Sequence, residues 1–547
     1  MTRTDVKIHS RRPRIVMLLA NSFLHDTRVY KEARSLIEWG CEVHVIAMCN
    51  SALPTKEEVD GIHVHRVSMR RGDLWRLFPV VLCWCCRPAL RWLLRPVRVR
   101  ALPHETSEVT GESPAPLARL RSALNQLYRR HLARVRLLRA ASPRVAAVVR
   151  FLRRVVAYFY RGAVRFGYRP IVRAVRAEQR RFRMVVRGIS RRCQRLVPTS
   201  GRLLAINVGF VRKTLELAPD IVQSHDLNTL FGGALVKRLT GARLVYDSHE
   251  LFLKRNIGNK SRARDNLIWA PIERFCIGKC DAVLSVAEGI CDYLAKQYGI
   301  SKPHLIRNVQ PFEPPGARTT ILADELGIPA GRRIVIYPGA ITINRGLEVM
   351  IDSAPHLNGS AYVIMGYARN ADYLASLKQR ATKLGVMSSS VFFREAVPID
   401  DVVRYVASAD LGIVPTQNVC LSYFFESSNK IFHCVMAGVP VAMSDHLEKR
   451  LLVEEYGIGV LFDETDPTKI ARVVNETLDD REAYAVMRRN CLEAARVLNW
   501  EHEEHNFRQI FADLLGDRAA PIPQVLIESV CAIQTQSPGH PHYVTTK

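Results

Sequence analysis

The chain has 547 residues, 13 cysteines and a formal net charge of +27. This length allows about three domains. The apolar run at 77–86 is well short of the roughly 20 residues that a membrane-spanning helix needs, so it does not predict a span. The first residues lead into a strand pattern without a secretory signal, which predicts free cysteines and a cytoplasmic location.

The first predicted α/β unit places polar residues at the end of a strand. A strand is predicted over residues 15–20, and an amphipathic helix follows it, capped by Asp26 and ended by Gly40. Because open α/β sheets bind ligands at the carboxyl ends of their strands, His25, Asp26 and Arg28 are predicted to lie at a crevice.

Further strand-like runs alternate with helical patterns and predict a parallel sheet covered on both faces, at residues 43–47, 221–223, 244–247 and 282–286. Two polar pairs follow strands of this set, His225-Asp226 and His249-Glu250. Their position favours polar groups of the crevice over zinc ligands. No ligand set at metal spacing occurs elsewhere, so no metal site is predicted.

An arginine-rich segment, residues 70–200, interrupts this first domain. It contains 31 Arg, no Lys and five acids, so it carries +26 of the net charge of +27. Apolar residues at helical spacing between Val145 and Phe159 oppose a face of arginines. This pattern predicts a mainly helical insertion that meets an anionic membrane surface. The alternative is a helical hairpin with solvated arginines; nucleic-acid binding is not predicted, because no recognisable nucleic-acid module accompanies the charge.

The proline-rich stretch at 308–316 predicts the boundary between two α/β domains. After it, a second set of strand-like runs alternates with helices, at residues 334–337, 362–365, 391–393, 411–414 and 439–442. We therefore predict two Rossmann-like domains, an N-terminal one over 12–312 that contains the insertion 70–200 and a C-terminal one over 317–499.

Two elements follow the second domain. The pattern at 500–515 predicts a helix, and the polar, proline-containing residues 516–547 predict a mobile tail.

Two segments of the second domain predict an anion site. In the first, a strand and a glycine loop lead to Arg345-Gly346 and a helix; in the second, Asn429 and Lys430 begin a helix that stops at Gly438. Helix N-termini, a guanidinium and an ammonium together suit a diphosphate. Either cation alone is equally well explained as a solvated surface charge, whereas the two together favour a nucleotide site.

Six segments in order resemble the retaining glycosyltransferases of family 4, which have the GT-B fold of two Rossmann-like domains facing a cleft. The resemblance covers most of the chain. The segments are RIVMLLANSFLHDTRVYKEARSLIEWGCEVHVIA, LAPDIVQSHDLNTLFGGALVKRLTGARLVYDSHELF, CDAVLSVAEGICDYLAKQYG, VIMGYARN, VFFREAVPIDDVVRYVASADLGIVPT and SNKIFHCVMAGVPVAMSDHLEKRLLVEEYGIGVLF.

The resemblance implies a glycosyltransferase of the hexosyltransferase type that uses a nucleoside-diphosphate sugar as donor and needs no metal or other cofactor. It implies that Arg345 and Lys430 stabilise the leaving diphosphate electrostatically. It also implies that the helix at 500–515 crosses back to the first domain. The predicted donor-side residues are Gly339, Gly346, Gly366, Glu426, Asn429 and His433, and the predicted acceptor-side residues are His25, Asp26, Arg28, Asp226 and His249.

The chain departs from the family pattern at three positions. The family often places two glutamates before the Ala-Gly-x-Pro element, where this chain has Phe425, next to Glu426, and His433. A basic residue usually follows the loop glycine, where this chain has Ala340. His433 can still hydrogen-bond a ribose.

The sequence therefore predicts a glycosyltransferase that lies peripherally on the cytoplasmic face of the membrane and acts on a lipid-linked or polysaccharide acceptor. Two alternatives stay open: a non-catalytic GT-B scaffold of a polysaccharide-assembly complex, which the missing glutamate would suit, and a sugar-nucleotide epimerase. Transfer or hydrolysis of a nucleotide sugar distinguishes an enzyme from a scaffold. A donor sugar changed without any acceptor would indicate the epimerase.

Overall fold

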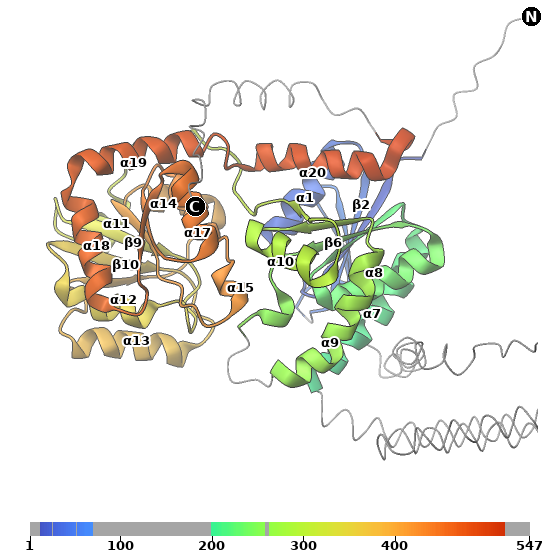
Figure 1. The fold of residues 1–547 in the computed structure, drawn as a ribbon, viewed down its shortest axis with the longest axis horizontal. Helices are drawn as coiled ribbons and strands as arrows, with labels where there is room; N and C mark the ends of the chain where they lie inside the picture. The colour runs from blue at the N-terminus through green and yellow to red at the C-terminus, as the bar shows by residue number, and fades with distance from the viewer. Residues whose placement is uncertain are drawn as a thin grey trace, which may run out of the picture. The chain divides into compact units, whose positions relative to one another are not determined.

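The computed structural model of the chain describes residues 11–24, 26–50, 52–68, 198–256, 262–314 and 316–519. Helices and two sheets make up most of these residues (Figure 1). Most of the predicted insertion, up to residue 197, and the predicted tail beyond residue 519 lie outside the described residues.

The first sheet has eight strands among the described residues, in the order β3-β4-β2-β1-β5-β6-β7-β8. Every neighbouring pair is parallel except β3 and β4. The strands are β1 (Arg14–Leu18), β2 (Glu42–Met48), β3 (Lys56–Val59), β4 (Ile62–Val67), β5 (Ile221–His225), β6 (Arg243–Ser248), β7 (Ala282–Ser285) and β8 (His304–Leu305).

The helices that accompany this sheet are α1 (Thr27–Glu38), α7 (Pro198–Leu217), α8 (Leu227–Thr240), α9 (Arg262–Cys276) and α10 (Glu288–Tyr298). The first of them begins as predicted, because the Asp26 side chain accepts a hydrogen bond from the Val29 backbone at 3.2 Å. It ends before Gly40, which has a φ of +89°.

The second sheet is parallel throughout, in the order β11-β10-β9-β12-β13-β14. Its strands are β9 (Arg333–Pro338), β10 (Ser360–Met365), β11 (Val391–Arg394), β12 (Leu411–Val414), β13 (Val441–Ser444) and β14 (Gly459–Phe462). The helices are α11 (Ile321–Leu326), α12 (Leu347–Ser353), α13 (Ala371–Lys383), α14 (Val402–Val406), α15 (Leu421–Phe424), α16 (Asn429–Met436), α17 (Leu447–Tyr456), α18 (Pro467–Asp479), α19 (Arg481–Ala494) and α20 (Trp500–Leu515). The predicted pair of Rossmann-like domains is confirmed.

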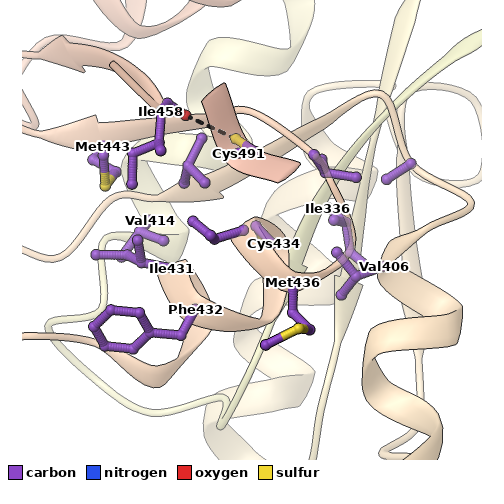
Figure 2. Close-up of a cluster of buried hydrophobic side chains, with 14 of the residues drawn as sticks. Ile336, Val406, Val414, Ile431, Phe432, Cys434, Met436, Met443, Ile458 and Cys491 are labelled. Carbon is purple, nitrogen blue, oxygen red and sulfur yellow. Dashed lines mark hydrogen bonds between the residues drawn. The ribbon is translucent and has the colours of Figure 1, made fainter. Parts of the chain in front are cut away.

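The helix α16 is anchored in the core of the second domain. Its side chains Ile431, Cys434 and Met436 are buried with residues of β9, β12 and β13 (Figure 2). Gly412 on β12 allows the helix to approach closely, since a Cβ there would lie 2.5 Å from the Cys434 sulfur. This packing fixes the start of α16, where Asn429 lies, at the carboxyl ends of the strands.

The helix α20 packs against the first domain although it follows the second in sequence. Trp500 and Phe507 are buried in one cluster with residues of β1 and α1, such as Val29. The indole Nε1 of Trp500 donates a hydrogen bond of 3.0 Å to Ser35 Oγ on α1, and Figure 1 shows α20, in red, beside α1. The end of the chain's second domain is therefore tied to the first helix.

A search of the described residues for helices long and apolar enough to cross a bilayer finds none.

Candidate active site

The first turn of α16 holds Lys430 near the end of β9. Its ammonium donates a hydrogen bond of 3.1 Å to Ser428 Oγ and lies 5.3 Å from the centre of the Tyr337 ring. Burial lowers the pKa of Lys430 to about 8, and the neighbouring Arg345 contributes to the same shift. An anion bound beside Lys430 would therefore stabilise its protonated form.

Three glycines let the loops of this region come close together. A Cβ at Gly366 would lie 1.9 Å from the carbonyl oxygen of Gly339, and one at Gly346, whose φ is +76°, would lie 1.7 Å from the carbonyl oxygen of Pro415. At Gly339, the place of a Cβ is taken by Lys430, whose Cε would be only 2.5 Å away. A larger residue at any of the three positions would displace a neighbour.

Arg345 lies in the loop between β9 and α12 and is already paired. Its Nη1 donates to both carboxylate oxygens of Glu426, at 2.6 and 2.5 Å, and its guanidinium stacks 4.4 Å from the Tyr423 ring centre. Burial would raise the pKa of Glu426, but Arg345, Lys430 and Lys449 together outweigh it and lower that pKa to about 2. Glu426 is therefore ionised at neutral pH.

These side chains border a cavity of about 440 Å³. Both predicted cations and four of the six predicted donor-side residues line it, and the other two, Gly346 and Gly366, lie in the loops that form it. The first domain contributes His249, Glu250, Val286 and Ile290. The second domain contributes Pro338, Gly339, Ala340, Arg345, Tyr367, Ile399, Ser422, Tyr423, Glu426, Ser427, Ser428, Asn429, Lys430 and His433.

His433 borders the cavity as a neutral imidazole. Its Nε2 lies 3.4 Å from Gln310 Nε2, and its buried Nδ1 has no hydrogen-bond partner among the described residues. Burial lowers the pKa of His433 to about 4, and the positive charges of Lys31 and Lys430 add to the effect. A ligand hydroxyl in the cavity could supply the missing partner of Nδ1.

A buried network stands behind His249 on the first domain. Arg28 donates to both oxygens of Asp247, each at 2.9 Å, and also pairs with Glu32 at 3.0 Å. Oδ2 of Asp247, which accepts from Arg28 Nε, also lies 2.9 Å from His249 Nε2 and 3.2 Å from His225 Nδ1. Burial opposes the charge of His249, but the carboxylates of Asp247 and Asp226 raise its pKa to about 10, so it presents a cation.

Three further acceptor-side candidates, Asp26, Arg28 and Asp226, are not among the residues that line the cavity. Asp26 caps α1 and accepts a hydrogen bond of 2.8 Å from Asn21 Nδ2. Asp226 lies behind His249, with an Oδ2 to Nδ1 distance of 3.8 Å, and Arg28 is buried in the network. His25 lies outside the described residues.

Three residues of this network come close enough to suggest a metal site. His225, Asp247 and His249 offer ligand atoms that lie within 4.8 Å of one another. In the structure, these side chains are hydrogen-bonded to one another, and Arg28 donates to both oxygens of Asp247. The arrangement fits a hydrogen-bonded ion network better than a cation site.

Two ionisable groups near the cavity are not among the predicted donor-side or acceptor-side residues, although the sequence predicts Glu250 as a polar group of the crevice. Glu250 lines the cavity, and burial together with the charge of Asp226 raises its pKa to about 7. Lys449 on α17 is fully buried, and its ammonium donates a hydrogen bond of 2.7 Å to Ser444 Oγ. The pair His249-Glu250 was noticed as polar, but no local pattern marks Lys449, which is placed only by the packing of α17.

Two family models match the chain in succession. The model of Glycosyltransferase Family 4 matches residues 152–309, and that of Glycosyl transferases group 1 matches residues 319–495. Together they span more than half of the chain.

Characterised relatives are similar over about half of the chain. The alpha-maltose-1-phosphate synthase of Mycolicibacterium smegmatis is 23% identical over 318 residues, which are 54% of this chain and 79% of that protein. The D-inositol 3-phosphate glycosyltransferase of Thermobispora bispora is 23% identical over 338 residues, 58% of this chain and 76% of that protein.

Solved structures support the fold. Sucrose-phosphate synthase from Thermosynechococcus elongatus superposes with a TM-score of 0.61 at 12% identity, covering 92% of this chain and 99% of that one. An alpha,alpha-trehalose-phosphate synthase from Burkholderia vietnamiensis gives a TM-score of 0.53 at 11% identity, with 92% and 99% covered.

Proposed function

Because the chain belongs to glycosyltransferase family 4, we propose that it moves a sugar from a nucleoside-diphosphate sugar to a lipid-linked or polysaccharide acceptor, with retention at the anomeric carbon. Its relatives include a D-inositol 3-phosphate glycosyltransferase. Membership of this family favours transfer over the scaffold and epimerase alternatives.

The excess of positive charge at the cavity carries the proposal. Arg345, Lys430 and Lys449 all act on one carboxylate, that of Glu426, and the two lysines are buried. Buried charges are costly unless they are paired, so a site with three basic groups and one acid suits a doubly charged anion. The diphosphate of a nucleotide sugar has this charge.

In the proposed reaction, the acceptor oxygen forms a bond to the anomeric carbon as the bond from that carbon to the diphosphate breaks. The electron pair leaves with the diphosphate, which takes the acceptor proton. Arg345 and Lys430 stabilise the growing negative charge. Gly339, Gly346 and Gly366 shape the loops around it, as their close contacts support.

The other site residues have separate proposed tasks. Glu426 and Asn429 face the donor sugar, and His433 offers its unpartnered Nδ1 to the ribose. On the acceptor side, His249 meets the substrate, held by Asp247 and Arg28. His25, Asp26 and Asp226 complete the proposed acceptor side.

Nucleotide binding tests the donor site. Thermal shift with UDP, GDP, ADP and dTDP, and with sugars of each, should show selective stabilisation of the wild type by one nucleotide. At a concentration of 100 Kd the ligand adds about 2.7 kcal/mol of stability. Arg345→Ala and Lys430→Ala should lose this shift, whereas Arg472→Ala and Lys378→Ala, both exposed cations, should keep it. Equal shifts in all five proteins would contradict the proposal.

The proposed membrane attachment rests on the charge of residues 70–200. Wild-type protein should sediment with vesicles rich in phosphatidylglycerol and not with phosphatidylcholine alone, and 0.5 M salt should release it. Replacing Arg150, Arg153, Arg154 and Arg161 by Gln should weaken sedimentation. If the wild type sediments with neither kind of vesicle, the proposed membrane attachment is refuted, and the proposed donor site is not affected.

A further inference from the structure

Arg345, the cation proposed to bind the donor diphosphate, is paired with Glu426 in this structure. Nη1 of Arg345 donates to both oxygens of Glu426, at 2.6 and 2.5 Å, and both residues line the cavity. A diphosphate that binds Arg345 must share or break this ion pair. Glu426 would then be a half-buried carboxylate short of a counter-charge, which is costly unless a second cation is at hand.

A chain of contacts links Lys449 to this ion pair. Its ammonium donates a hydrogen bond of 2.7 Å to Ser444 Oγ and lies 3.4 Å from His446 Nδ1. The same imidazole nitrogen is 3.3 Å from the backbone oxygen of Tyr423, whose ring stacks on Arg345. Lys449 is therefore connected to the ion pair through contacts with one imidazole and one tyrosine.

The ammonium of Lys449 has neutral partners at contact distance. It is fully buried, and within the described ranges no carboxylate lies within ion-pair distance of it. Such a group is unusual, because buried ammonium groups are normally paired.

Several charges act on Lys449 from the elements around it. Burial lowers its pKa to about 7; Glu426 and Glu464 act to raise the pKa, and Lys430 and Arg345 act to lower it. His446 beside it also has a lowered pKa, because it is buried. Near neutral pH a fraction of Lys449 is therefore unprotonated, and an anion in the cavity would favour its charged form.

We propose that Lys449 is a positioning residue that becomes the counter-ion of Glu426 when a diphosphate draws Arg345 to itself. The inference rests on the proposed function, since it assumes a diphosphate in the cavity. The exchange leaves Glu426 paired and able to face the sugar, while Arg345 turns to the leaving group. The proton that completes the charge of Lys449 comes from the buffer, so nucleotide binding takes up protons.

Isothermal titration calorimetry tests the exchange. The nucleotide among UDP, GDP and ADP that binds is titrated at about pH 7.5 in HEPES and in Tris, whose ionisation enthalpies differ, so that the heats give the protons exchanged. The wild type should take up a fraction of a proton. Lys449→Met should take up fewer protons and should bind the nucleotide on the order of tenfold more weakly. A factor of this size is typical of energetic coupling between two sites.

Two further variants separate this role from a purely structural one. Lys449→Arg keeps a permanent charge, so it should restore affinity without restoring proton uptake. Glu250→Gln removes a cavity group whose pKa is raised to about 7 and should leave the proton uptake by Lys449 in place. Lys430, whose pKa is lowered to about 8, takes up protons in the wild type and in Lys449→Met alike, so the difference between these two proteins measures Lys449. If Lys449→Met melts like the wild type and still takes up the same protons, or if only Glu250→Gln abolishes uptake, the inference is wrong.

The outcomes for the two proposals are distinct. If no nucleoside diphosphate binds the wild type, the proposed function fails. If one binds and Lys430→Ala abolishes binding, but Lys449→Met changes neither affinity nor proton uptake, the donor site stands and the counter-ion role of Lys449 is refuted.

Discussion

The side chain of Lys430 lies against the α-carbon of Gly339, so closely that a Cβ at position 339 would be 2.5 Å from Lys430 Cε. These residues belong to the end of β9 and the start of α16. The contact brings Lys430 next to the loop that contains Ala340, where the resemblance to family 4 led us to expect a basic residue. A cation from another helix can therefore replace a cation missing from the loop.

Gly339→Ala should weaken nucleotide binding through this contact. The added methyl group forces Lys430 to move by some tenths of an ångström or more, which disturbs a charge aimed at the diphosphate. We expect affinity for the cognate nucleoside diphosphate to fall about tenfold, with a small loss in melting temperature, as measured by thermal shift and calorimetry. Gly278→Ala is the matched control, since a Cβ there meets no atom within 4 Å. Unchanged affinity in Gly339→Ala would show that Lys430 does not act from this position.

Glu426→Gln should separate binding from transfer. Because Arg345 would no longer be held by a carboxylate, we expect the free nucleoside diphosphate to bind as tightly as in the wild type or a few-fold more tightly. Sugar transfer should fall by on the order of 100-fold, because the group that faces the sugar has lost its charge. Calorimetry with UDP, GDP or ADP and a transfer assay check the two halves. A large loss of diphosphate affinity would mean that Glu426 supports the site in another way.

The parallel strands could be predicted from sequence because they are buried on both faces. Runs such as 15–20 and 411–414 are continuous and apolar, and they correspond to β1 and β12. The hairpin of β3 and β4 was missed because the Lys56–Val59 strand lies at an edge, is mostly polar and has little apolar signal. The strand β14 was also missed: it lies at the edge of its sheet, and two of its four residues are only half-buried, so its apolar signal is weaker than that of β12.

The candidate site was only partly visible in the sequence. Glycine loops and helix starts mark Arg345 and Lys430, because these motifs are local. Arg28 was predicted at the crevice from its place after a strand, but it pairs with Asp247 more than 200 residues away and is buried. Lys449 carries no local signal, because its burial depends on how α17 packs.

The charge of His249 should make the stability of the protein depend on pH. Its pKa is raised from 6.5 to about 10. The protonated imidazole therefore adds fully to the free energy of unfolding below pH 6.5, and this stabilisation is lost as the pH rises through about 10. The lowered pKa values of Lys31, Lys430 and Lys449 make the protein more stable as the pH rises, which is opposite to the effect of His249. The effect of His249 is therefore measured as the difference in stability between the wild type and a His249 variant at each pH.

His249→Gln should therefore be less stable than the wild type at about pH 6.5, by on the order of 1–3 kcal/mol, and the gap should narrow toward pH 10. Urea unfolding at several pH values measures it. His304→Gln, at an exposed position, is the control and should follow the wild type throughout. A gap that stays constant with pH would mean that His249 is not held as a cation.

Trp500→Ala should loosen the attachment of α20 to the first domain. The indole is buried against α1 and donates to Ser35 Oγ, so its removal leaves a cavity and an unpaired hydroxyl. We expect a loss of about 3–5 kcal/mol, seen as a lower urea midpoint and as faster hydrogen exchange in α1 and α20. Asn506→Ala, at an exposed position of the same helix, should change neither. If α1 exchanges no faster in Trp500→Ala than in Asn506→Ala, then α20 does not stabilise the first helix, and the crossing contact has no energetic role.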